Sequence, residues 1–240
     1  ERGAFPLFNA ELYLSGGNFA SRLPAEVKAE IRKHGLRNSH FLSTAPTGTI
    51  SLAFADNDST AQRTTGFVDC QSHLFLPELI ELMRKRRTEP LVYDQDGVAI
   101  LKMGDWLRKV PPPYTSVEAK LAAMDTSGIA ITLLSTNDPG PEWFGDDGPA
   151  VAQLIHDSLA GVIARHPKRF RGLCTLPLQN EAAAAAELDR CVKQLGFRGI
   201  LLYTNLAGVW CDEPPFHWLY ARAEELEVPI LLHQIGRAHV

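Results

Sequence analysis

The sequence has few cysteines, no excess of positive charge and no apolar run that approaches the length of a membrane span. Its 4 cysteines are widely and irregularly spaced, which gives neither a CxxC pair nor a disulfide framework. We therefore expect a reducing, cytoplasmic setting, with Cys70 and Cys174 as buried thiols in apolar runs. The formal net charge of −4 gives no electrostatic reason to expect binding to nucleic acid or to a membrane.

The N-terminus also lacks features that a complete precursor would have. The chain begins with Glu1-Arg2-Gly3, without an initiator Met, and no apolar signal segment follows. We therefore expect the chain to start inside a longer reading frame. Its 240 residues, 45% hydrophobic and 22% charged, have an ordinary globular composition that can form one large domain or two small ones.

From about residue 62 onwards, short apolar runs alternate with helical patterns. This order predicts an α/β fold with a parallel sheet, because each pair of neighbouring strands is joined by a helix. Five strands fit either an open sheet or part of a closed barrel. The polar strand ends at His73, Asn137, Asn205 and His233 favour the barrel, in which functional groups gather at that face. We predict strands over residues 67–73, 129–136, 170–176, 199–204 and 228–233, helices over 77–87, 116–128, 149–166, 180–196 and 215–226, and a hairpin-like excursion over 93–107.

The first 60 residues contain a short predicted helix, residues 23–33, and a loop rich in hydroxyl groups. The loop residues Thr47, Gly48, Thr49 and Ser51 place three hydroxyls and a glycine within five positions. Such a loop can bind an anion, because the glycine lets the backbone approach and the hydroxyls and amides donate hydrogen bonds. An ordinary turn is the alternative interpretation.

A metal site is predicted at the end of the first strand of the second segment. Alternate residues of a strand point to the same side, so Asp69, Gln71 and His73 are expected to share one face. His233 ends another strand and can converge on the same point. Imidazoles with a carboxylate suit zinc or a related divalent ion, which can activate water near neutral pH. The alternative is that the two histidines only satisfy polar loops.

Two other histidines, His156 and His217, fall on predicted helices, and we expect both at the surface. Trp143 and Trp210 fall in loops that follow strands. They can line a substrate pocket, although packing is the simpler interpretation.

Several stretches of the second segment resemble a known family. The first strand, Asp69 to His73, resembles an Asp-x-His-x-His motif, and further matching stretches are Ala119–Asp125, His166–Leu173, Gly196–Ile200 and Val228–His233. The segment resembles the amidohydrolase superfamily, in the group that includes aminocarboxymuconate-semialdehyde decarboxylase-like enzymes. The resemblance implies a (β/α)8 TIM-type barrel with one divalent metal, zinc or manganese. It also implies hydrolysis or non-oxidative decarboxylation of a small-molecule substrate, a carboxylate or lactone.

The resemblance assigns roles to four residues. His73 matches the second histidine of the motif and His233 the metal ligand that ends the fifth strand. Gln71 stands where the first histidine is expected, and its neutral oxygen is a weaker ligand. Asp69 lies beside these ligands and can support them from outside the coordination sphere. The family's later histidine and aspartate have no counterpart. We therefore expect an incomplete barrel of five strands, without an assignable catalytic residue, that is inactive.

A second resemblance covers the N-terminal segment. The stretches that carry it are Phe5–Asn9, Leu14–Ala20, Arg37–His40 and Ala45–Asn57. They resemble the catalytic barrel of ribonucleotide reductase, in its adenosylcobalamin-dependent class. The resemblance implies that Thr47, Gly48, Thr49 and Ser51 hold substrate phosphates. The radical-bearing cysteine and a cofactor domain have no counterpart, so we expect no adenosylcobalamin binding and no reductase activity.

The two resemblances divide the chain at about residue 60. We interpret residues 1–60 as a reductase barrel fragment, 61–234 as a truncated amidohydrolase-related barrel and 235–240 as an adapter-derived tail, joined in a chimeric translation. Two alternatives stay open at this point. One is a cobalamin-dependent reductase fragment from an enzyme that converts ribonucleotides to deoxyribonucleotides, and the other is a non-enzymatic fusion that binds a partner. The sequence makes no prediction of oligomeric state.

Overall fold

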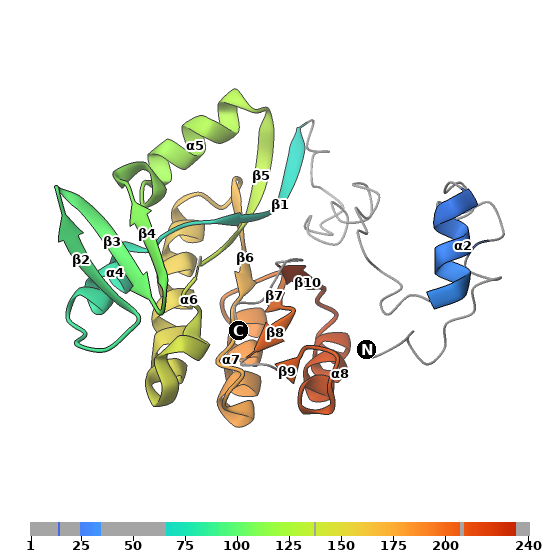
Figure 1. Cartoon of the computed structure of the whole chain (residues 1–240). Coiled ribbons are helices and arrows are strands. Elements are labelled where there is room, and N and C mark those ends of the chain that lie inside the picture. Colours follow the sequence, from blue (N-terminus) through green and yellow to red (C-terminus); the bar gives the residue numbers. More distant parts are fainter. Residues whose placement is uncertain (1–13, 15–24, 35–65, 137, 207–208, 234–240) are drawn as a thin grey trace. The chain divides into compact units, whose positions relative to one another are not determined.

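The computed structural model describes residues 14, 25–34, 66–136, 138–206 and 209–233 (Figure 1). Contacts between Cα atoms divide the chain into two units, Glu1–Thr49 and Ile50–Val240. In the first unit, α2 spans Ala25–His34, close to the helix predicted over residues 23–33. The predicted phosphate loop (Thr47, Gly48, Thr49 and Ser51), the adapter-like residues 235–240 and Asn137 lie outside the described residues.

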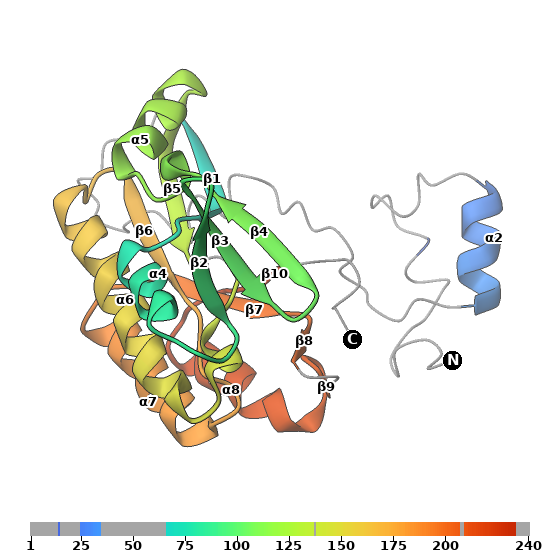
Figure 2. The same cartoon turned by 60° about the vertical axis from the view of Figure 1, so that its left-hand side comes forward.

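The second unit is built on a parallel five-stranded sheet with the order β1-β5-β6-β7-β10. Each new strand is added next to the previous one, which is the order of a (β/α)8 barrel and decides against an open doubly wound sheet. The strands curl into a half-barrel (Figures 1 and 2). The predicted fold class is therefore confirmed. The strands are β1 (Phe67–His73), β5 (Ile129–Ser135), β6 (Phe170–Cys174), β7 (Gly199–Tyr203) and β10 (Ile230–His233).

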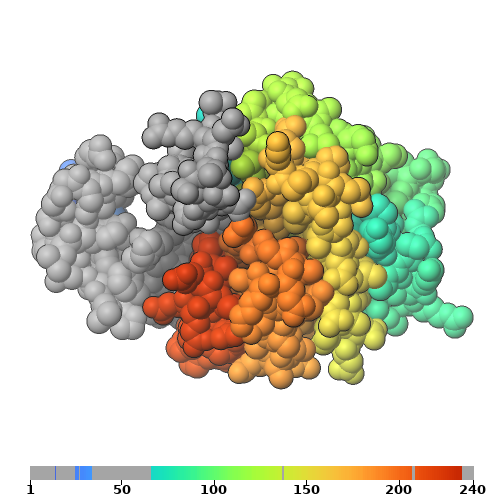
Figure 3. All heavy atoms as spheres, turned by 180° about the vertical axis from the view of Figure 1, so that it is seen from behind, coloured from blue at the N-terminus to red at the C-terminus, as the bar shows by residue number. Residues whose placement is uncertain are grey.

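Helices cover the outer face of this sheet, as Figure 2 shows. Seen from behind, three of them form adjoining bands, yellow for α6, orange for α7 and red for α8 (Figure 3). Two helices that begin close to their predicted starts are capped there, since the side chains of Ser116 and Asn180 accept hydrogen bonds from the amides of Ala119 and Ala183. The helices are α4 (Pro77–Arg84), α5 (Val117–Thr126), α6 (Gly148–Arg165), α7 (Glu181–Lys193) and α8 (His217–Glu225).

The apolar core lies mostly between the helices and the sheet. Leu134, Phe170 and Ile200 point outward into this large cluster, which also holds the buried thiols of Cys174 and Cys191. The opposite face of the sheet has a smaller apolar cluster formed by Ile131, Leu133, Leu173 and Leu201. The alternation of the two sets along each strand follows from the two-residue period of a strand.

The excursion between α4 and α5 is a separate antiparallel sheet. It has three strands, β2 (Leu91–Gln95), β3 (Val98–Met103) and β4 (Trp106–Val110), where the sequence predicted a hairpin. Asp96 and Gly97 connect the first two strands, and both have positive φ angles, as a tight hairpin turn requires. This sheet lies beside the half-barrel (Figure 1).

Short elements lie at the carboxyl ends of the strands. They are the 3₁₀ helices η2 (Pro112–Tyr114), η3 (Pro141–Asp147) and η4 (Pro214–Phe216) and the small hairpin of β8 (Asn205–Leu206) and β9 (Val209–Trp210). None of the helices in the described parts of the chain combines the length and the apolar character that a membrane crossing requires.

Candidate metal centre

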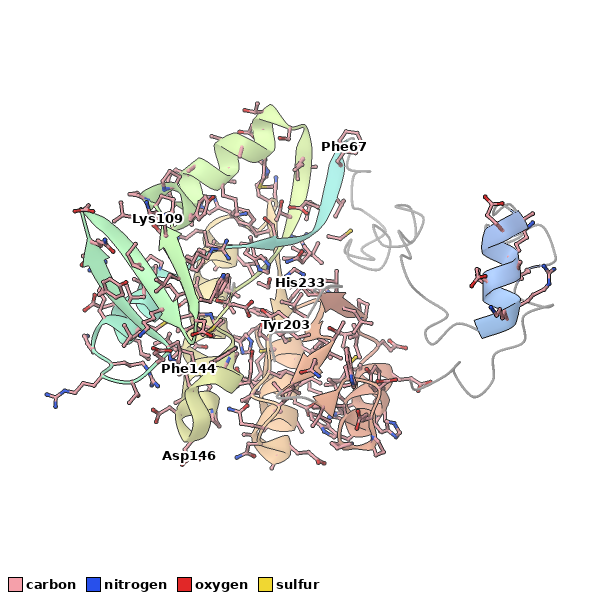
Figure 4. All side chains as sticks on the ribbon, in the orientation of Figure 1. Phe67, Lys109, Phe144, Asp146, Tyr203 and His233 are labelled. Carbon is pink, nitrogen blue, oxygen red and sulfur yellow. The ribbon has the colours of Figure 1, made fainter. Side chains whose placement is uncertain are left out.

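The first and the last strand of the curled sheet bring two histidines together. His73 ends β1 and His233 ends β10, and their Nε2 atoms are 3.1 Å apart although 160 positions separate them in the chain. The ring centroids are 4.8 Å apart, with an edge-on arrangement. Figure 4 shows His233 in the middle of the unit, next to Tyr203. The structure thus places side by side the two histidines that the sequence singled out.

The hydrogen bonds of His73 determine which of its nitrogens carries the proton. Its Nδ1 lies 2.8 Å from the carbonyl oxygen of Thr136 and 3.0 Å from the Ser135 hydroxyl. A carbonyl only accepts, so Nδ1 donates its N–H and Nε2 keeps a lone pair, with the amide nitrogen of Gln71 at 2.7 Å and Nε2 of His233 at 3.1 Å from it. This is the tautomer that a metal-binding imidazole needs.

Both histidines are neutral at pH 7. Burial, followed by the nearby His233 and the positive charges of Arg108 and Lys120, lowers the pKa of His73 to about 4. Burial also lowers the pKa of His233, partly opposed by Asp138. A neutral imidazole is the form that binds metals, because the charged form has no lone pair.

The donor set fits a divalent ion. Two nitrogens bound to one ion at about 2.1 Å each lie roughly 3.0–3.4 Å apart for bond angles between 90° and 110°, and the two Nε2 atoms meet this condition at 3.1 Å. The amide of Gln71 lies on the same side, with its Nε2 2.7 Å from Nε2 of His73. Its carbonyl oxygen is a neutral, weak ligand, so His73 and His233 are the main candidates.

Asp69 does not share this face, contrary to the expectation from strict alternation. Asp69 pairs with Thr132 and Ser72 with Leu134, so β1 has one extra residue between them, a β-bulge. The bulge turns the Asp69 carboxylate away from the histidines, toward the amide of Gln71 and the hydroxyl of Thr132. Burial raises the pKa of Asp69, while the positive charge of Lys120 opposes the shift.

The bulge also affects Cys70. The thiol was expected to be buried, but Cys70 is half-buried and its Sγ lies 3.9 Å from the carbonyl oxygen of Val68. The prediction rested on the apolar run around Cys70, and such a run does not by itself determine how deeply one of its side chains is buried.

His156 is fully buried, so its predicted surface position is wrong. Its Nδ1 donates to Glu187 at 2.6 Å, and the Thr175 amide donates to its Nε2 at 3.1 Å. The carboxylate favours a second proton on the ring, but the Thr175 N–H occupies Nε2, so we take the ring as neutral. Arg190 also bonds to Glu187, at 2.8 and 2.9 Å, and with His156 it lowers the pKa of Glu187 to about 2 despite burial.

This buried group has the residue types of a metal site. Atoms of His156, Glu187 and Cys191 lie within 4.8 Å of one another. The ring nitrogens and the carboxylate already have protein partners, so the group links α6, α7 and β6 structurally. His217 is exposed, as predicted. Trp143 is 45% exposed and Trp210 is 39% exposed, so neither is a packing residue of the core.

Sequence reasoning missed several polar residues around the histidines. Thr175 follows β6 and Tyr203 ends β7, and the Tyr203 ring centroid is 5.7 Å from that of His233. Glu142, in η3, borders a small cavity together with both hydroxyl residues. Tyr203 could have been found from its place at a predicted strand end. Glu142 and Arg108 could not, because their proximity to the site depends on how η3 and the small sheet fold over it.

Family comparisons give the context for this geometry. The profile of the family described as Amidohydrolase matches residues 68–239, most of the chain. The chain belongs to the amidohydrolase family. The profile described as "Ribonucleotide reductase, barrel domain" matches residues 1–65. Both family resemblances seen in the sequence are confirmed, while the adenosylcobalamin-dependent class of the reductase stays a prediction. The amidohydrolase match includes residues 235–239, and their expected origin in an adapter stays a prediction.

Several relatives with assigned activities are decarboxylases, and one, from Sphingobium sp., is a 2-keto-4-carboxy-3-hexenedioate hydratase, 37% identical over 38% of the chain and 30% of that protein. The chain is 36% identical to a gamma-resorcylate decarboxylase of Polaromonas sp., over 61% of the chain and 47% of that protein. It is 29% identical to a 2-amino-3-carboxymuconate-6-semialdehyde decarboxylase of Dictyostelium discoideum, over 54% of the chain and 37% of that protein. The chain spans about half the length, or less, of these curated relatives.

Solved structures of the family share the fold. A 2,6-dihydroxybenzoate decarboxylase in complex with 2,6-dihydroxybenzoate matches with a TM-score of 0.53 and 26% identity, over 72% of this chain and 51% of that one. A dihydroxybenzoic acid decarboxylase from Polaromonas sp. JS666, with bound manganese and the inhibitor 2-nitroresorcinol, matches with a TM-score of 0.51 and 25% identity, over 72% and 50%.

Proposed function

We propose that residues 66–233 form part of a metal-dependent decarboxylase site for a small aromatic carboxylate. The observation that supports this most directly is the pair of neutral imidazoles, His73 and His233, whose Nε2 atoms converge at 3.1 Å. Manganese or zinc is the ion we propose. The manganese in a related structure and the decarboxylase relatives favour this reaction over hydrolysis.

The residues around the pair suit a carboxylate substrate. Arg108 lies near His73 and contributes to lowering its pKa. Its guanidinium stacks over the rings of Phe75 and Trp106, at 5.0 and 5.6 Å from their centroids. Stacking holds the positive charge of the arginine in place near His73, and a positive charge favours a carboxylate. A bound ion would act as a Lewis acid on a substrate oxygen.

Metal binding tests this proposal directly. We expect Mn²⁺ binding, measured by calorimetry or electron paramagnetic resonance, to weaken by at least about tenfold in His73→Ala and in His233→Ala. His217→Ala removes an exposed histidine and serves as the matched control. Equal Mn²⁺ affinity in all four proteins would refute the site. Metal-dependent turnover that is lost in His73→Ala would instead contradict our expectation that the chain is inactive.

The ribonucleotide reductase match supports a separate proposal for the N-terminal segment. The two family matches do not overlap, since one ends at residue 65 and the other begins at residue 68. We propose that the two segments descend from different parent proteins, with a nucleotide-phosphate loop at Thr47, Gly48, Thr49 and Ser51 in the first. Long sequencing reads across residues 59–66 test whether the two segments are joined in any genome, and reads in which the two are continuous would contradict a chimeric translation. Nucleotide binding that is lost in Thr47→Ala with Thr49→Ala tests the loop.

A further inference from the structure

The bulge in β1 changes which side chains of the strand face the metal centre. Before the bulge, Val68 packs against the smaller apolar cluster, so its side chain lies on the inner face of the sheet. In a regular strand, residues an even number of positions apart share a side. Ser72 would then lie on the inner face with Val68, and His73 would point outward, away from His233.

The structure has the opposite arrangement after the bulge. His73 points inward, where its Nε2 lies 3.1 Å from Nε2 of His233. Ser72 points outward, since its hydroxyl contacts Lys120 on α5, one of the helices on the outer face (Figure 2). Between Asp69 and Ser72, β1 advances by three positions and β5 by only two. The extra residue reverses the alternation, and in this way a bulge redirects the side chains that follow it.

A polar cluster on the outer face surrounds the bulge. Lys120 donates a hydrogen bond to Oγ of Ser72 at 2.6 Å. The amide of Gln71, within the bulge, donates to Oδ1 of Asp69 at 3.3 Å, and the hydroxyl of Thr132 donates to Oδ2 at 3.5 Å. Side chains from α5 and β5 therefore hold the two residues that flank the bulge.

Lys120 and Asp69 are a partly buried pair of opposite charges. Burial lowers the pKa of Lys120, and the charge of Asp69 opposes this shift. Burial also raises the pKa of Asp69, opposed by the amide of Gln71 and then by the charge of Lys120. Such a pair adds little net stability, because the cost of taking both charges out of water offsets their attraction. Its effect is therefore expected in the conformation of β1 rather than in overall stability.

We propose that Asp69, Ser72 and Lys120 are positioning residues of the metal centre. They hold the bulge, and the bulge directs His73 and Gln71 to the inner face. All three lie on the outer side of β1, so they act through His73 and not on the ion. The inference rests on the proposed function for the ion itself, whereas the direction of the His73 ring can be measured without any metal.

Mn²⁺ titration of the full chain by calorimetry separates this role from a simple effect of charge. Lys120→Met removes a positive charge that acts on His73, and this loss alone should tighten the binding of a cation. Loss of the bulge should instead weaken binding, and we expect a loss of about tenfold. Ser72→Ala changes no charge and should also weaken binding, whereas Ser72→Thr keeps the hydroxyl and the affinity. Lys168→Met removes an exposed charge and is the matched control. Unchanged or tighter binding in Lys120→Met would overturn the proposal.

Nuclear magnetic resonance of the metal-free chain tests the direction of His73 by itself. The ring centroids of His73 and His233 are 4.8 Å apart, close enough for a nuclear Overhauser effect between ring protons. We expect this signal in the wild type and its loss in Lys120→Met and Ser72→Ala. Thermal unfolding checks that each variant is folded, and Ser72→Ala, the milder change, decides the test where Lys120→Met does not fold.

The two measurements distinguish failure of the inference from failure of the metal site. A signal that persists in the folded variants would overturn the inference, whatever the affinity for Mn²⁺. A signal that is present in the wild type and lost in the variants, in a chain that binds no Mn²⁺, would refute the proposed metal site and leave the role of the bulge standing.

Discussion

Gln71 is the residue at which this site departs most from the motif it resembles. Its amide lies beside His73 but brings no charge to the site. A carboxylate at this position would add a negative oxygen ligand, so Gln71→Glu should bind Mn²⁺ about tenfold or more tightly. Calorimetry measures the change, and Gln95→Glu, on the exposed end of β2, controls for net charge. Unchanged Mn²⁺ affinity in Gln71→Glu would show that the ion does not bind beside residue 71.

Glu142 makes stability depend on pH. Burial raises the pKa of its carboxyl group from the ordinary 4.5 to about 8 in the folded chain. The folded state therefore binds more protons between these two values, and the free energy of unfolding falls as pH rises through this window. Glu142→Gln, which is neutral at every pH, should flatten that fall. Urea unfolding at pH 5, 7 and 9 measures it, with the exposed Glu224→Gln as control. Identical pH profiles for Glu142→Gln and the wild type would contradict the prediction.

At the scale of elements, the buried group of His156 and Glu187 holds α6, α7 and β6 together. Glu187→Ala leaves the ring N–H of His156 without its acceptor and leaves Arg190 with Asp157 as its remaining carboxylate partner. We expect a loss of about 2–4 kcal/mol in the free energy of unfolding. Denaturant unfolding measures this, and Glu224→Ala on the exposed side of α8 is the comparison. A change below about 0.5 kcal/mol would show that the link is dispensable.

The elements themselves were largely predictable, because apolar runs and caps are local signals. Asn180 and Ser116 begin their helices as expected, and the five strands fall where the apolar runs predicted them. The bulge in β1 was not predictable, since it depends on how β1 pairs with β5. His156 was misplaced because helix position alone does not show that Glu187 and the Thr175 amide will face it.

At the scale of the whole molecule, the two outer strands of the sheet each have one edge that no other described strand pairs with. Among the described strands, β1 pairs only with β5, and β10 only with β7. Leu232 on β10 is 48% exposed. Open edges with apolar side chains favour association, so we expect the chain to self-associate as its concentration rises.

Leu232→Lys tests this expectation, because a charge on an edge strand opposes pairing with another chain. Light scattering over a concentration series should show less association in Leu232→Lys than in the wild type. Leu107→Lys changes a residue that is 58% exposed on the small sheet and serves as control. A wild-type chain that stays monomeric and melts cooperatively would contradict the expectation.

The positions of His73 and His233 on the two opposite edges of the sheet have a thermodynamic consequence. An ion bound by both would connect the first strand to the last strand through two residues that are 160 positions apart in the chain. Flattening the sheet would then require releasing the ion, so each tenfold excess of Mn²⁺ over its Kd would add about 1.4 kcal/mol to the work of opening. The affinity for the metal would therefore set how strongly the curled form of the sheet is favoured over an opened form.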